Sequence, residues 1–115
     1  MEDKIVFKGD EGAFVTAAAA ARLQERYLFT AKEQGKEEPI RAQFFGKEFL
    51  RKMLNKKGAM GIRIYHGMDE NGDPSLVLVP TDAYGKNLVE NTSGLKDMPD
   101  ASDHGADGPR CPKTC

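Results

Sequence analysis

The aromatic residues of this chain are confined to its first 90 positions. All nine of them lie before Asn91, and the 25 residues that follow contain Leu95 as the only Leu, Ile, Val or Phe. Fixing a residue costs roughly 1–2 kcal/mol of backbone entropy, so such a segment stays disordered unless it docks on the body or is cross-linked. We therefore predict one domain over residues 1–90 and an irregular, disordered Pro-, Gly- and Asp-rich tail over residues 91–115.

The periodicity of the body changes from helical to extended along the chain. Apolar residues recur at helical spacing over residues 16–34, where Thr16 is a suitable N-cap, and again over residues 47–57. From Gly61 onward the period is two, which predicts strands over residues 61–66, 76–79 and 87–89, with a hairpin turn at Asn71 and Gly72. Residues 40–45 predict a further short strand.

These elements predict an α+β fold in which two helices pack on a small antiparallel β-meander. The apolar stripe of the second helix should pack on one face of the sheet, because this contact shields the apolar side chains of both elements from water. The expected core joins that stripe to the sheet and consists of Phe49, Met53, Ile62, Ile64, Leu76 and Leu78.

Charge and hydropathy exclude several classes of partner. Lys and Arg number 17 against 18 Asp and Glu, and the net charge of −1 lacks the basic excess of a dedicated nucleic-acid binder. A cluster of lysines in the second helix is the usual composition of a solvated face, so nucleic acid is not expected as a partner. No apolar run is long enough to span a membrane, and residues 1–4 do not resemble the start of a signal peptide. We expect a soluble, cytoplasmic protein.

Two cysteines end the chain, in the order Cys111-Pro-Lys-Thr-Cys115. Their spacing permits free thiols, a small-loop disulfide, or two thiolate ligands of a soft metal. A complete zinc site would need two more ligands, and the only histidines are His66 and His104. All three states remain open, and Cys111 and Cys115 are the candidate metal ligands.

Polar side chains on the first predicted hairpin strand form the candidate binding surface. Arg63 and Tyr65 point to one face of that strand, and His66 at its end points to the other. Asp69, Asn71 and Asp73 match the start of a calcium loop, but Pro74 follows them where that loop requires Gly, so a hairpin turn is the better interpretation. We predict no catalytic residues, because no nucleophile–base pair or phosphate-binding glycine loop is visible.

The chain resembles a family of short uncharacterised bacterial proteins. The resemblance is carried by Phe44 to Lys47, Gly61 to Gly67, Asp69 to Gly72, Leu76 to Val79, Asp82 to Gly85 and the Cys-Pro-x-x-Cys tail. It implies no assigned activity. A looser similarity to A-type iron–sulfur carriers rests on the Gly-Ile-Arg-Ile strand and the cysteine pair. Those carriers have a third cysteine in the loop that here runs from Met68 to Asp73 without one.

Two functions from different classes follow. The first is a non-enzymatic protein-interaction module that self-associates, as a homodimer, or holds a protein partner on a sheet edge or polar face, because a short meander leaves strand edges unpaired. The alternative is a thiol or metal-binding protein, with zinc or an iron–sulfur cluster as cofactor, that acts through Cys111 and Cys115.

Overall fold

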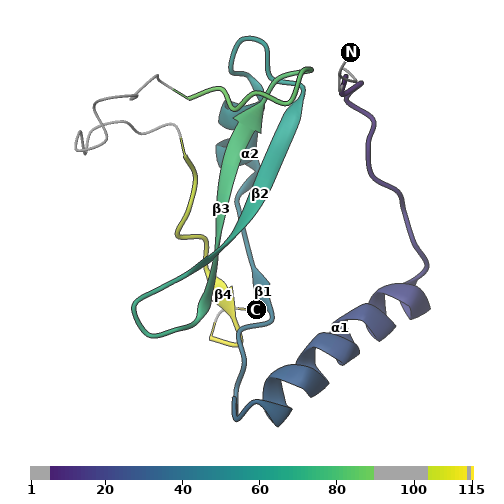
Figure 1. Cartoon of the computed structure of the whole chain (residues 1–115), viewed down its shortest axis with the longest axis vertical. Coiled ribbons are helices and arrows are strands. Elements are labelled where there is room, and N and C mark those ends of the chain that lie inside the picture. Colours follow the sequence, from purple (N-terminus) through teal and green to yellow (C-terminus); the bar gives the residue numbers. More distant parts are fainter. Residues whose placement is uncertain (1–5, 90–103, 114) are drawn as a thin grey trace, which may run out of the picture.

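The computed structural model describes residues 6–89, 104–113 and 115, and has the α+β class expected from the sequence (Figure 1). Two helices and four strands follow one another in the order α1 (Ala17–Glu33), β1 (Ala42–Gln43), α2 (Lys47–Leu54), β2 (Gly61–Met68), β3 (Pro74–Thr81) and β4 (Arg110–Cys111). Within the described residues, neither helix has the length and apolar composition needed to cross a bilayer.

The centre of the molecule is the antiparallel hairpin of β2 and β3. Its register places Ile64 opposite Leu78 and Met68 opposite Pro74. The turn follows the predicted Asn-Gly signal, because Gly72 takes a φ of 83°, which other residues adopt only at a cost. The predicted third strand over residues 87–89 is reduced to a single bridge between Thr81 and Asn87.

The outer edge of β3 is covered along its whole length by other parts of the same chain. Every second residue of the strand is hydrogen-bonded outward, with donor–acceptor distances of 2.7–2.8 Å. The Leu88 N–H donates to Pro80 O, and Gly105 exchanges two backbone hydrogen bonds with Leu78. The Gln43 side-chain oxygen accepts from the Leu76 N–H, and the Arg110 guanidinium donates to Pro74 O.

The described part of the tail is folded against the body, which corrects the expectation of disorder. β4 pairs with β1, placing Cys111 opposite Ala42, and Gly105 exchanges two hydrogen bonds with Leu78. The composition argument considered only large apolar side chains, whereas this segment is held by backbone hydrogen bonds, glycines in close contact and a cross-link. Leu95 and the rest of residues 91–103 lie outside the described residues.

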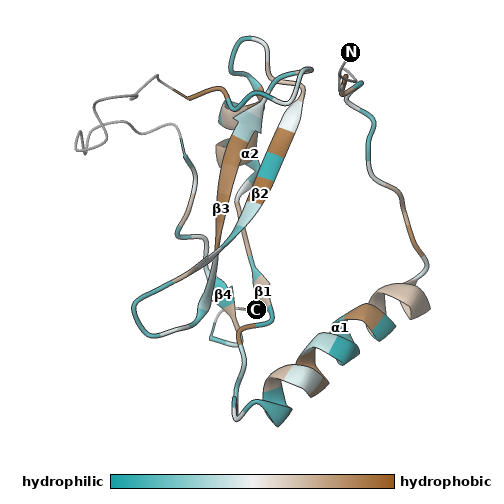
Figure 2. Cartoon of the chain, in the orientation of Figure 1, coloured by the Kyte–Doolittle hydropathy of each residue, from teal (hydrophilic) through white to brown (hydrophobic). Residues whose placement is uncertain are grey.

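Helix α2 packs on one face of the hairpin, behind it in the view of Figure 1, and contacts both β2 and β3. A Cβ added to Gly105 would lie 3.2 Å from Met53 Sδ and against the Phe49 ring, so this helix lies over the Gly105 side of β3. Met53 and Leu78 are accordingly buried, and β3 is the most continuously apolar strand in Figure 2.

The expected core was wrong at Ile64 and Phe49 and only partly right at Ile62 and Leu76. Ile64 retains 55% of its exposure, so α2, although it contacts β2, does not cover this residue. Phe49 is also exposed, at 36%, and Ile62 and Leu76 are half-buried. The alternation of apolar residues predicts which face of a strand each side chain is on, but it does not predict how much of that face the helix covers.

Helix α1 projects from the hairpin and contacts the body near its C-terminal end (Figure 1). It begins where the sequence predicts, with Thr16 Oγ1 accepting a hydrogen bond from the Ala19 N–H at 3.1 Å. Ala31 in its last turns is buried, whereas Leu23 and Phe29 remain about 60% exposed. The helix therefore has an apolar surface that the described chain does not cover.

Candidate functional site

Two of the three polar residues predicted on β2, Arg63 and Tyr65, lie together on one face of the hairpin. The Arg63 guanidinium donates to Gly85 O and to Asn87 Oδ1, both at 3.0 Å, and Asn87 Nδ2 donates to the Tyr65 hydroxyl at 2.8 Å. The bond from Asn87 and the neighbouring Arg63 charge lower the pKa of the Tyr65 hydroxyl. Asn87 is the central member of this cluster, and the sequence analysis missed it because it comes from a distant turn.

His66 lies on the opposite face of β2, as the alternation of the strand predicts. It is exposed, stands opposite Leu76 in the register and lines a shallow cavity of about 230 Å³ with Tyr27, Ile40 and Gln43. The structure therefore brings Arg63 and Tyr65 together but does not add His66 to their cluster. These groups can hold a loop or contact a partner, and none is paired with a nucleophile among the described residues.

The outer edge of β2 is the most distinctive feature of this surface. In an antiparallel pair, a residue whose N–H and C=O point outward stands opposite another outward-pointing residue. Leu78 is bonded outward to Gly105, so its partner Ile64 also directs its backbone groups away from the hairpin. By the same alternation, the backbone N–H and C=O groups of Ile62, His66 and Met68 also point outward. Among the described residues, nothing is hydrogen-bonded to these outward groups.

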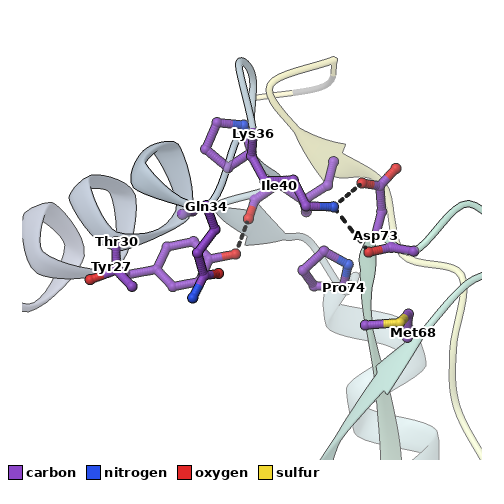
Figure 3. A pocket seen from close by; sticks show the side chains of 11 residues that line it. Tyr27, Thr30, Gln34, Lys36, Ile40, Met68, Asp73 and Pro74 are labelled. Atoms are coloured by element: carbon purple, nitrogen blue, oxygen red, sulfur yellow. Dashed lines mark hydrogen bonds and ion pairs between the residues drawn. The ribbon is translucent and has the colours of Figure 1, made fainter.

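A second cavity of about 210 Å³ lies where α1 meets the tip of the hairpin (Figure 3). Tyr27 reaches across it and donates to Ile40 O at 2.8 Å. On the other side the Lys36 ammonium lies 3.7 Å from the Asp73 carboxylate and donates to Gly72 O at 3.2 Å. Both contacts fasten the end of α1 to the hairpin, so the lining residues have a structural use.

Cys111 and Cys115 are joined in a disulfide, the second of the three states that the spacing permits. Cys111 is buried on β4, whereas Cys115 is exposed and lies 3.6 Å from the Arg41 guanidinium. Among the residues that the structure describes, no three His, Cys, Asp or Glu side chains are grouped to hold a metal. Disulfides persist in oxidising compartments, so the pairing does not support the expected cytoplasmic location.

Asp69 links the hairpin tip to the tail. Its Oδ1 accepts from the N–H groups of Asn71 and Asp73 at 2.9 Å, and its Oδ2 lies 3.0 Å from the Arg110 guanidinium. The Asp73 N–H, together with Arg110 and the Asn71 N–H, lowers the pKa of the Asp69 carboxyl. The residue thus acts as a turn-forming anchor, which agrees with the hairpin interpretation of this loop.

The lowered pKa predicts that Asp69 stabilises the fold at neutral pH and not in strong acid. The stabilisation is present above the ordinary carboxyl pKa and is lost as the pH falls through the lower folded-state value. Asp69→Asn should therefore lower Tm at pH 7, and the gap between parent and variant should close toward pH 2. Glu70→Gln, an exposed change in the same turn, should lower Tm less at pH 7. A gap that stayed constant with pH would contradict this role of the charge.

Comparisons of the chain with protein-family models, curated proteins and solved structures found no match.

Proposed function

We propose that this protein is a non-enzymatic interaction module that binds an extended segment of a protein partner along the outer edge of β2. The observation that carries the proposal is the contrast between the two edges of the hairpin. Four segments of the chain bond to the outer edge of β3, whereas the four outward-pointing residues of β2 have no bonded partner among the described residues. Native proteins usually cover or blunt such an edge, because it is a template for another strand.

The side chains along β2 suit strand addition. Ile64 and Met68 point to one face and are 55% and 74% exposed, so an added strand with apolar residues at alternate positions would cover them. On the other face the Arg63–Tyr65–Asn87 cluster fixes two side chains next to the same edge. Backbone bonds would supply affinity and the alternate side chains specificity.

A thiol or metal function through Cys111 and Cys115 has less support. Metal ligands and thiol nucleophiles are thiolates, and both sulfurs are used in the disulfide. Cys111 is also buried beside β1, where the pair fastens the end of the chain. We assign the cysteines a structural use.

The test is a selection of extended peptides from a display library on the full chain with its disulfide closed. Selected peptides should slow amide exchange at Ile62, Ile64, His66 and Met68, because these N–H groups gain partners. Ile64→Lys should weaken peptide binding at least tenfold, since an edge lysine opposes strand addition. Phe44→Lys, at an exposed site away from β2, should bind as the parent does. Selected peptides that bind the Ile64→Lys variant and the parent equally would refute the proposal.

A further inference from the structure

The open edge of β2 is complementary to itself. Its only formally charged side chain is Arg63, so two copies can pair antiparallel without placing like charges opposite each other. Like charges directly opposite are destabilising in a sheet, and this strand avoids them. We propose that the extended segment that binds this edge is β2 of a second copy of the chain, an inference that rests on the function proposed above.

One register satisfies the side chains best. A two-fold axis at Ile64 places Ile64 against Ile64 of the second copy and Arg63 opposite Tyr65 on both sides of the axis. The guanidinium and the aromatic ring then attract each other through a cation–π contact. An axis at Tyr65 would instead put Arg63 opposite Gly67, which has no aromatic ring, and an axis at His66 would put two imidazoles together. The structure therefore favours the axis at Ile64.

One further observation supports a closed pair. Because the chain covers the other edge of the hairpin itself, each copy offers one edge, and the pairing ends at a dimer instead of growing into a fibre.

The test combines oligomeric state with cross-linking. Sedimentation of the parent at tens of micromolar should give a dimer, and Ile64→Lys should give a monomer while Phe44→Lys stays dimeric. Directly opposed, hydrogen-bonded residues have Cα atoms about 5.5 Å apart, a distance that a disulfide spans. Ile64→Cys should therefore form a covalent dimer through residue 64 under mild oxidation. Met68→Cys, four residues from the axis and at a more exposed position, should not.

The outcomes separate this inference from the proposed function. A monomeric parent that still binds selected peptides on the β2 edge would overturn self-pairing and leave strand addition intact. A dimer that persists in Ile64→Lys, or one that cross-links in the Met68→Cys variant and not in the Ile64→Cys variant, would place the interface or the register elsewhere. A monomer that also selects no edge-binding peptide would overturn both.

Discussion

Truncation of Leu78 to alanine is expected to lower the free energy of unfolding by about 2–5 kcal/mol, the range for removing a buried leucine side chain. Leu78 is 2% exposed, lies beneath α2 and exchanges two backbone hydrogen bonds with Gly105. The cavity would open between the hairpin and the docked tail, where backbone bonds on both sides of β3 limit its collapse. Urea unfolding followed by circular dichroism would measure the loss.

Leu23→Ala is the matched control, because it removes the same atoms from an exposed site on α1. It should change the free energy of unfolding by less than about 1 kcal/mol, since little apolar surface is returned to water. Both variants should be compared with the parent at one protein concentration, because self-association raises the apparent stability of the folded chain. A midpoint for Leu78→Ala equal to that of the parent would show that this residue is not part of the core.

Local sequence patterns were sufficient to predict the hairpin and both helices. The period of two, the Asn-Gly turn and the amphipathic stripe at Phe49 and Met53 depend on residues close together in the chain. Thr16 also caps α1 as expected, because its hydroxyl bonds within the same turn. For this reason the α+β class could be predicted without knowledge of any long-range contact.

The patterns could not show which edge of the hairpin would be covered. That outcome depends on Gln43 and Arg110, whose side chains bond to β3 from 33 and 36 residues away. The same limit explains Ile64, which alternates correctly with Arg63 yet lies on a part of β2 that α2 leaves exposed. The sequence placed Arg63 and Tyr65 on one face of β2 and His66 on the other, where the structure also has them, but the open edge of the strand was visible only in the tertiary structure.

The docking of the tail was not predicted because it depends on glycines, which have no side chain. Gly105 and Gly108 allow the chain to approach α2 and the Phe44 backbone more closely than any other residue would permit. Composition counts such glycines as a sign of flexibility, whereas here they permit contact. No local sequence pattern distinguishes a glycine that makes the chain flexible from one that permits close contact.

Gly108→Ala is expected to release the tail from the body. The added Cβ would overlap the Phe44 carbonyl oxygen and lie 3.2 Å from the Phe45 ring. The carbonyl has little room to move away, because the adjacent Phe44 N–H is bonded to Pro109 O at 2.7 Å and Gln43 Nε2 to Gly108 O at 2.8 Å. Overpacking of this kind typically costs about 1–3 kcal/mol.

The release should be seen as local opening rather than global unfolding, because β2, β3 and α2 do not require residue 108. Amide exchange should accelerate roughly 5- to 150-fold at Phe44 and Arg41, the fold-change that corresponds to that cost, since both N–H groups are bonded to the tail. Trypsin should also cleave after Arg110 faster than in the parent. Gly61→Ala, where an added Cβ meets no atom within 4 Å, should leave both rates unchanged. If Gly108→Ala behaved as Gly61→Ala does, the close approach of the tail to Phe44 would be refuted.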